Sequence, residues 1–281
     1  MSSRRAEMLC LAALLAFCAC EWDLWGIVTR KTVEQRVQEN LTGQPPAPGP
    51  VSVNPDSFRF AVFGDPQIVH DNVNMLGRFK QDIAARDIDF FCVLGDLTND
   101  ATTDEVDSIK LDLDRVGVPC YVTIGNHDLF QADGWERFKE NYGPSCFRVV
   151  IAHRIKLIFL DTADGTIGPT QFDWLEKELR DSPFIKIVLT HYPVYDGEEP
   201  IMWRLASPVE RAKLQSLLGK YDVYAWCAGH IHGWRHAVVE GVNHFTCGTM
   251  ASGELDYGSG KGYLLFTFAH DSLLWQQVVF E

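Results

Sequence analysis

Carboxylate, amide and imidazole side chains recur where apolar segments of this sequence end. Residues 90–94 form an apolar run that stops at Gly95 and Asp96, and four other stretches end in the same kinds of side chain. Because a carboxylate has two oxygen atoms and can bridge two cations, Asp96 is the candidate shared ligand of a metal centre. The side chains expected to assemble around it are Asp65, Gln67, Asn126, His127, Asp128, His191, His230 and His232.

Strands and helices that alternate along the chain would position these side chains. Residues 90–94 are aromatic and β-branched, which favours a strand buried on both faces. Gly95 then lets the backbone turn at the carboxyl end of this strand, where open α/β sheets bind their ligands. We expect further strands at 58–64, 119–124, 147–151, 156–161, 185–190 and 223–228, and helices at 73–86, 103–116, 135–142, 172–179 and 209–218.

The last part of the chain is expected to be all β, with strands at 234–240, 245–249, 262–268 and 273–280. Asp133 is expected to cap the helix at 135–142. Interleaved strands and helices followed by strands predict two packed sheets with helices outside. A polar crevice would form where the strand ends meet.

Composition narrows the class of protein. The chain has 281 residues, of which 46% are hydrophobic, and this is enough for one domain with a sizeable core. Its net charge of −13 argues against stable binding to nucleic acid. The eight cysteines show no CxxC pattern with zinc spacing and predict no disulfide framework. Cys92, Cys120 and Cys227 lie in apolar runs and are expected to act as small buried hydrophobes.

The first 57 residues indicate export. Arg4 and Arg5 precede an apolar run at 8–19 that is too short to span a bilayer, which favours a secretory signal at residues 1–20. The stretch 17–20 resembles a bacterial lipobox ending in Cys20, although Phe17 replaces the usual aliphatic residue. We therefore expect a lipoprotein of the bacterial cell envelope, facing the periplasm or cell surface and anchored in the membrane through a lipid on Cys20. The alternatives are an ordinary cleaved signal and a short uncleaved anchor.

The domain organisation follows from the same region. Residues 44–50 are rich in proline and predict an extended tether. Residues 21–57 would form an N-terminal segment with this tether, and 58–281 the folded domain.

The polar stretches also carry a family resemblance. Five of them match, in order and over about residues 58–270, the motifs of the calcineurin-like metallophosphoesterases. They are Asp65-Pro66-Gln67, Gly95-Asp96-Leu97-Thr98-Asn99, Gly125-Asn126-His127-Asp128, Thr190-His191-Tyr192-Pro193 and Gly229-His230-Ile231-His232. The resemblance implies a four-layer α/β/β/α sandwich, in which two mixed sheets are flanked by helices.

The resemblance also implies a site for two divalent or trivalent metal ions, such as manganese, iron or zinc. It assigns one metal to Asp65, Gln67, Asp96 and His232. It assigns the other to Asp96, Asn126, His191 and His230. Two metals would activate a bridging water for attack on a phosphoryl group. His127 would act as the general acid, and Asp128 would orient its ring.

Position 67 departs from the family pattern. The family usually has histidine there, whereas an amide side chain coordinates only through its oxygen and is a weaker ligand. Gln67 is therefore expected to impair the first metal site or to shift its preference toward a harder ion. His70 is a nearby alternative ligand, although exposure to solvent is the simpler expectation.

The resulting hypothesis is a metal-dependent hydrolase of a phosphomonoester or phosphodiester, with a small-molecule, nucleotide or lipid substrate. The loops at 196–204 and 253–262 would contact the substrate or merely cover a sheet edge. Two alternatives stay open. One is a catalytically weak envelope protein that keeps the fold and acts in binding. The other is a hydrolase that uses only the second metal.

Overall fold

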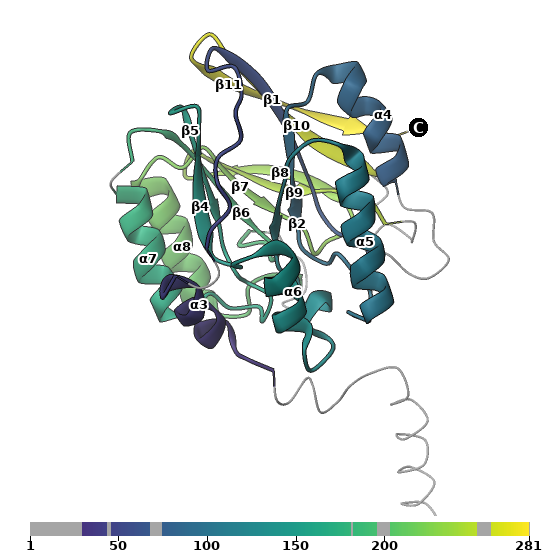
Figure 1. The fold of residues 1–281 in the computed structure, drawn as a ribbon. Helices are drawn as coiled ribbons and strands as arrows, with labels where there is room; N and C mark the ends of the chain where they lie inside the picture. The colour runs from purple at the N-terminus through teal and green to yellow at the C-terminus, as the bar shows by residue number, and fades with distance from the viewer. Residues whose placement is uncertain are drawn as a thin grey trace, which may run out of the picture.

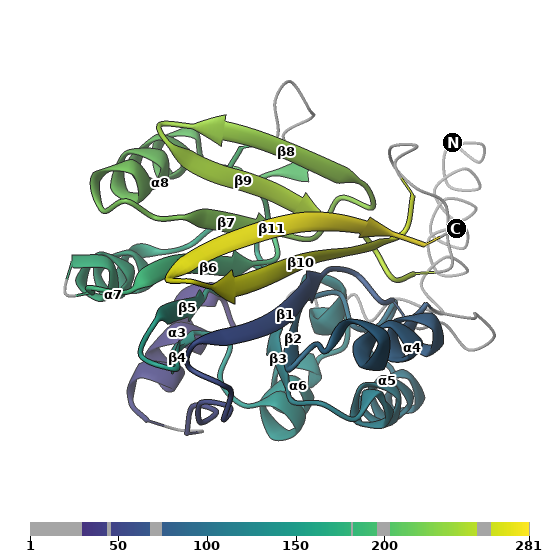
Figure 2. The same cartoon turned by 90° about the horizontal axis from the view of Figure 1, so that it is seen from above.

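Two β-sheets pack face to face, and helices cover their outer faces (Figures 1 and 2). The computed structural model describes residues 30–43, 46–67, 75–180, 182–195, 203–251 and 260–280. The predicted α/β sandwich of two mixed sheets flanked by helices is confirmed. Within the described residues, no helix is long and apolar enough to cross a membrane. The predicted signal and Cys20 lie outside the described residues.

The first sheet has the strand order β11-β10-β1-β2-β3. Strands β1, β2 and β3 are parallel, whereas β10 and β11 run antiparallel to their neighbours. The strands are β1 (Ser57–Phe63), β2 (Phe90–Leu94), β3 (Cys120–Thr123), β10 (Gly262–Ala269) and β11 (Ser272–Val279). The helices on this side are α4 (Leu76–Arg86), α5 (Thr103–Val116) and α6 (Gly134–Tyr142).

The second sheet has the strand order β4-β5-β6-β7-β9-β8, with β5, β6, β7 and β9 parallel. Its strands are β4 (Phe147–Ile151), β5 (Ile155–Phe159), β6 (Ile185–Thr190), β7 (Ala225–Ala228), β8 (Trp234–Val239) and β9 (Val242–Cys247). The helices on its outer face are α7 (Pro169–Arg180) and α8 (Pro208–Lys220). The carboxyl ends of the parallel strands therefore share one edge in each sheet.

The pattern of buried side chains explains why these segments form strands. All five residues of β2 are buried, because the strand lies between the opposing sheet and the helices, as its continuous apolar run predicts. Between the sheets, the ring of Phe60 stacks on Phe90 and Phe266, with centroids 5.0 and 4.8 Å away. Phe63 and Phe91 instead pack outward with Phe79 of α4. The period-two alternation thus supplies a separate core on each face of the sheet.

Helix ends follow local sequence signals in most places. Thr102 and Glu105 form a capping box at the start of α5, and Gly117 ends this helix in the left-handed region. Asp133 holds the N-cap position of α6, as predicted, but its side chain makes no capping hydrogen bond. Its carboxylate pairs with Arg137 instead.

Helix α3 (Val33–Leu41) adds part of the N-terminal segment to the folded body. Arg36 is fully buried, and its Nε and Nη2 donate to the two carboxylate oxygens of Asp161 at 2.8 Å each. Further along, Val51 donates its backbone N–H to the hydroxyl of Tyr121 at 3.0 Å. Residues on both sides of the proline-rich stretch thus contact the sandwich, while the domain boundary at residue 57 stays a prediction.

Candidate metal centre

The side chains singled out by sequence gather at the carboxyl ends of β1, β2, β3, β6 and β7. The backbone turns sharply there, with φ of 50° at Asp65, 48° at Asp96 and 66° at His230. Left-handed backbone at residues other than glycine is uncommon, and it clusters at functional sites. These turns let each strand end abruptly and present a polar side chain at the shared edge.

Glycine makes the close approach of the turns possible. A Cβ added to Gly125 would lie 2.2 Å from the backbone nitrogen of Asp96. A Cβ on Gly229 would lie 2.8 Å from Asp65 Oδ2 and 2.8 Å from the carbonyl oxygen of Leu94. Side chains at these two positions would force the turns apart, so the glycines fix the spacing of the cluster.

Asp96 lies at the centre of this cluster, as predicted. Its Oδ2 is 3.3 Å from His191 Nε2, and this nitrogen is 2.9 Å from Asn126 Oδ1 and 3.2 Å from His230 Nδ1. The candidate ligand atoms of Asp96, His191 and His230 all lie within 4.8 Å of one another. Carboxylate, amide and imidazole donors from four chain segments therefore face one small volume.

His191 is held in one orientation. Its Nδ1 donates to the carbonyl oxygen of Leu94 at 2.8 Å, which leaves Nε2 to face Asp96. This arrangement, in which the second ring nitrogen bonds to a carbonyl, is typical of metal-binding histidines. Burial lowers the pKa of His191, but the charges of Asp96 and Asp65 outweigh it and raise the pKa to about 9. Burial also opposes ionisation of Asp96, yet the neighbouring imidazoles hold its pKa well below the usual value.

Asp65 and Gln67 follow β1 and contact the same cluster. Both oxygens of Asp65 accept the backbone N–H of His230 at 3.0 Å. Burial, the largest cause, raises the pKa of Asp65 well above its usual range. The backbone N–H of Gln67 donates to Asp96 O at 3.0 Å, and its Nε2 is 3.5 Å from Asp96 Oδ2. His232 is half-buried in the turn after His230, so the first metal site stays a prediction.

His127 begins a short 3₁₀ turn (His127–Leu129) at the edge of the cluster. Its Nδ1 is 2.6 Å from the carbonyl oxygen of Asn99, and a carbonyl only accepts, so Nδ1 carries the proton. Its Nε2 lies 4.0 Å from Asp96 Oδ2. The ring therefore turns its second nitrogen toward the cluster.

The prediction that Asp128 orients the ring of His127 is wrong. Asp128 Oδ1 accepts the backbone N–H groups of Leu97 and Thr98 at 2.9 and 3.3 Å, and its Oδ2 accepts that of Gly125 at 2.9 Å. Burial and the charge of Asp96 raise the pKa of Asp128 to about 7. Asp128 joins the turn after β2 to the turn after β3, and the Asn99 carbonyl orients the imidazole instead.

Two contributors to the site were missed from the sequence. The ring of Tyr192 stacks on His230, with centroids 3.9 Å apart, and so limits how this imidazole can rotate. Tyr192 is held in turn by its backbone N–H, which donates to Thr162 Oγ1 at 2.9 Å. The only available signal was the position of Tyr192 beside His191. Asn99 was noted as part of a motif, but nothing in its side chain indicates a role for its carbonyl.

Histidines outside the five motifs have other surroundings. His153 and His270 are exposed. His236 pairs with Asn243 at 3.0 Å and does not contact the cluster among the described residues. His70 and most of the two predicted substrate loops lie outside the described residues.

Buried carboxylate, amide and imidazole groups at the strand ends of this two-sheet sandwich form a candidate metal site. The model of the calcineurin-like phosphoesterase family matches residues 58–234. The chain belongs to this family, as its five motifs indicated.

Curated relatives match about half of the chain. A probable glycerophosphodiester phosphodiesterase, GpdQ, of Arcobacter nitrofigilis is 33% identical over 159 residues, which cover 51% of this chain and 56% of the relative. The 3',5'-cyclic adenosine monophosphate phosphodiesterase CpdA of Escherichia coli K12 is 26% identical over 156 residues, covering 52% and 55%. The chain thus spans little more than half the length of these two relatives.

The fold is also similar to that of purple acid phosphatase PPD1 from yellow lupin. The TM-score is 0.64 at 16% identity, and the match covers 84% of this chain and 54% of the phosphatase. At this identity the likeness concerns the fold alone.

Proposed function

We propose that this protein is a metal-dependent phosphodiesterase that hydrolyses a small-molecule phosphodiester. The observation that carries the proposal is the meeting of Asp96, His191 and His230, whose ligand atoms lie within 4.8 Å of one another at the strand ends. Membership of the phosphoesterase family and two relatives named as phosphodiesterases support this reaction class.

The donor set suits transition-metal ions. His191 Nε2 and His230 Nδ1 lie 3.2 Å apart, and imidazole nitrogens together with carboxylate and amide oxygens are ligands that such ions accept. One metal would be held by Asp96, Asn126, His191 and His230. The other would be held by Asp65, Gln67, Asp96 and His232. When bound, the metals would supply an activated water and positive charge for the phosphoryl oxygens.

His127 would donate the proton that the leaving oxygen needs. Its Nδ1–H is held by the Asn99 carbonyl, so a protonated Nε2 would face the substrate. The backbone N–H of His127 donates to Asp96 Oδ1 at 2.9 Å, which fixes the imidazole relative to the shared ligand. These two contacts support the proposal that His127 is the general acid.

Hydrolysis of bis(p-nitrophenyl) phosphate by the purified chain with Mn²⁺ tests the proposal. Asp96→Asn removes the bridging carboxylate and is expected to abolish turnover. Asp56→Asn changes an exposed carboxylate outside the site and should leave turnover intact. Wild-type turnover in Asp96→Asn would refute the proposal.

Gln67 favours a second candidate function, a binding protein with weak or no catalysis. Its amide nitrogen, rather than its oxygen, is placed 3.5 Å from Asp96 Oδ2, where it can take over part of the role of a cation. Gln67→His is expected to raise metal content and turnover together if the protein is an enzyme with an impaired first site. If turnover stays undetectable with two metals bound, the binding function is favoured.

We also propose that the protein is exported to a bacterial cell envelope and anchored by a lipid on Cys20. The charged, apolar and small residues of positions 4–20 support this proposal. Incorporation of labelled palmitate in the wild type, but not in Cys20→Ala, is expected. Equal labelling of both would contradict the lipid attachment at Cys20.

A further inference from the structure

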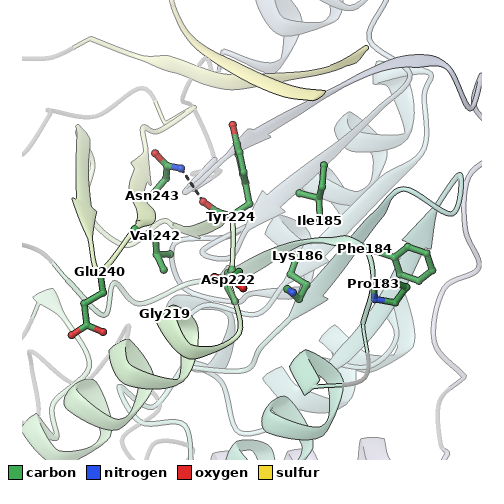
Figure 3. Close-up of a pocket in the computed structure, with 12 residues that line it drawn as sticks. Pro183, Phe184, Ile185, Lys186, Gly219, Asp222, Tyr224, Glu240, Val242 and Asn243 are labelled. Atoms are coloured by element: carbon green, nitrogen blue, oxygen red, sulfur yellow. Dashed lines mark hydrogen bonds between the residues drawn. The ribbon is translucent and has the colours of Figure 1, made fainter. Parts of the chain in front are cut away.

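Two depressions of similar size lie on the second sheet, at opposite ends of its strands. The one drawn in Figure 3 has a volume of about 520 Å³ and lies at the amino ends of β6, β7 and β9, away from the metal-centre edge. Its Asn243 is fully engaged, since Nδ2 donates to the Tyr224 carbonyl at 2.9 Å and Oδ1 accepts from His236. Asn243 is therefore not available to a ligand there.

The other depression, of about 490 Å³, is lined by residues of β8 and of the carboxyl half of β9. Tyr195, which lines it, comes four residues after His191. Thr246 also lines the depression and pairs with Ala228 of β7. The turn that carries His230 begins directly after Ala228. The depression is thus built from the segments that deliver the metal-site histidines.

Two polar residues of its lining, His244 and Thr246, point away from the space between the sheets. Phe245 and Cys247 belong to the core between the sheets, whereas Val242 packs in the outer core with α7 and α8. Because side chains alternate along a strand, His244 and Thr246 share the outer face with Val242. On this outer face, β9 therefore presents the apolar Val242 first and then the polar His244 and Thr246.

His244 and Thr246 are buried but have polar atoms without partners. His244 is 4% exposed and Thr246 is 2% exposed. His244 Nδ1 and Thr246 Oγ1 have no hydrogen-bond partner within the described part of the chain. Trp226, which pairs with His244 across β7 and β9, leaves its Nε1 unpaired there too. Buried polar groups are nearly always paired, so the two that line the depression, on His244 and Thr246, indicate a missing ligand.

The chemistry of His244 and Thr246 indicates the kind of group that they would bind. Burial, with a smaller effect of His236, lowers the pKa of His244 to about 4, so its imidazole is neutral at pH 7. A neutral imidazole and a hydroxyl each donate or accept and carry no charge, which suits a neutral group with mixed donor and acceptor edges. The half-exposed ring of Tyr195, 6.0 Å from the His244 ring, offers an aromatic surface for stacking.

We propose that this depression is a nucleobase subsite, in which Thr246 and His244 bond to the base edge and Tyr195 contacts its face. Its volume suits a planar heterocycle. The inference rests on the proposed phosphodiesterase function, and it identifies the substrate as a nucleotide.

Binding of nucleosides, which lack the phosphate, tests the subsite separately from hydrolysis. The full chain is titrated calorimetrically with adenosine, guanosine, cytidine and uridine. At least one is expected to bind, and Thr246→Val, which keeps the shape but removes the hydroxyl, should weaken it roughly tenfold, as expected for one hydrogen bond. Thr246→Val should also raise the melting temperature of the free protein, because it removes an unpaired buried hydroxyl. Thr267→Val, on the first sheet, is the matched control for binding.

The outcomes separate the two proposals. If none of the four nucleosides binds, or if Thr246→Val binds them as tightly as the wild type, the subsite is refuted whatever the hydrolytic activity. If a nucleoside binds with the expected loss in Thr246→Val, but the wild type with Mn²⁺ hydrolyses no phosphodiester, the subsite stands and the proposed function fails.

Discussion

Replacing Gly125 by alanine perturbs the metal centre through a single methyl group. The added Cβ would lie 2.2 Å from the backbone nitrogen of Asp96 and 2.2 Å from its Oδ1. Neither the backbone of Asp96 nor its carboxylate can move freely to make room, because the carboxylate accepts the backbone N–H of His127 at 2.9 Å. To reach the 3.4 Å of an ordinary contact, the turns after β2 and β3 must separate by more than an ångström.

Both stability and activity should respond. Forcing extra volume into a packed contact destabilises a protein by about 1–3 kcal/mol, and we expect the upper part of this range because backbone atoms are involved. A displacement of roughly 1 Å at a catalytic site lowers the rate on the order of 100-fold. Urea unfolding and the kcat for bis(p-nitrophenyl) phosphate with Mn²⁺ measure the two effects.

Gly77→Ala is the matched control. Gly77 lies in α4, is exposed, and has open space where a Cβ would be added. Alanine in a helix is more stable than glycine by up to about 1 kcal/mol, so this variant should be as stable as the wild type or slightly more stable. Wild-type stability and kcat in Gly125→Ala would show that the two turns do not touch as described.

Two further substitutions test other parts of the account. His127→Gln is expected to lower kcat by roughly 10²–10⁴-fold for a diester with an alkoxide leaving group, and far less for a nitrophenolate, which needs no proton. Equal losses for both substrates would contradict the role of His127 as proton donor. Arg36→Met leaves the buried Asp161 carboxylate unpaired and should reduce the free energy of unfolding by about 3–5 kcal/mol. Arg36→Met with Asp161→Leu should recover much of this loss in urea unfolding, and a stable single variant would show that α3 is not anchored by the pair.

The strands and the main ligands could be predicted because their signals are local. Residues 90–94 are apolar at every position, and Gly95 and Asp96 mark the end of the run. Parallel strands bring such ends to one edge of each sheet, and the face-to-face packing of the two sheets then brings Asp96, after β2, to His191, after β6. The antiparallel hairpin of β4 and β5 can be predicted in the same way, because only residues 152–154 separate the two strands.

Contacts between distant residues could not be predicted in the same way. The Arg36–Asp161 pair joins residues 125 apart in sequence, and nothing near Arg36 marks it for burial. The ring of His127 is held by a backbone carbonyl, a group that every residue carries, so the sequence pointed to the nearest carboxylate, Asp128, instead. The sequence does not mark His244 either, because the lack of a partner for its Nδ1 within the described residues becomes apparent only when β9 is placed in the sheet.

The central claim is that Asp96 bridges two metal ions at the strand ends. Anomalous diffraction from crystals of the full chain soaked in Mn²⁺ tests it most directly. The account predicts two anomalous peaks, about 3.5 Å apart, one on each side of the Asp96 carboxylate. A single peak would refute the bridging role of Asp96, and no peak near Asp96 would refute the metal centre.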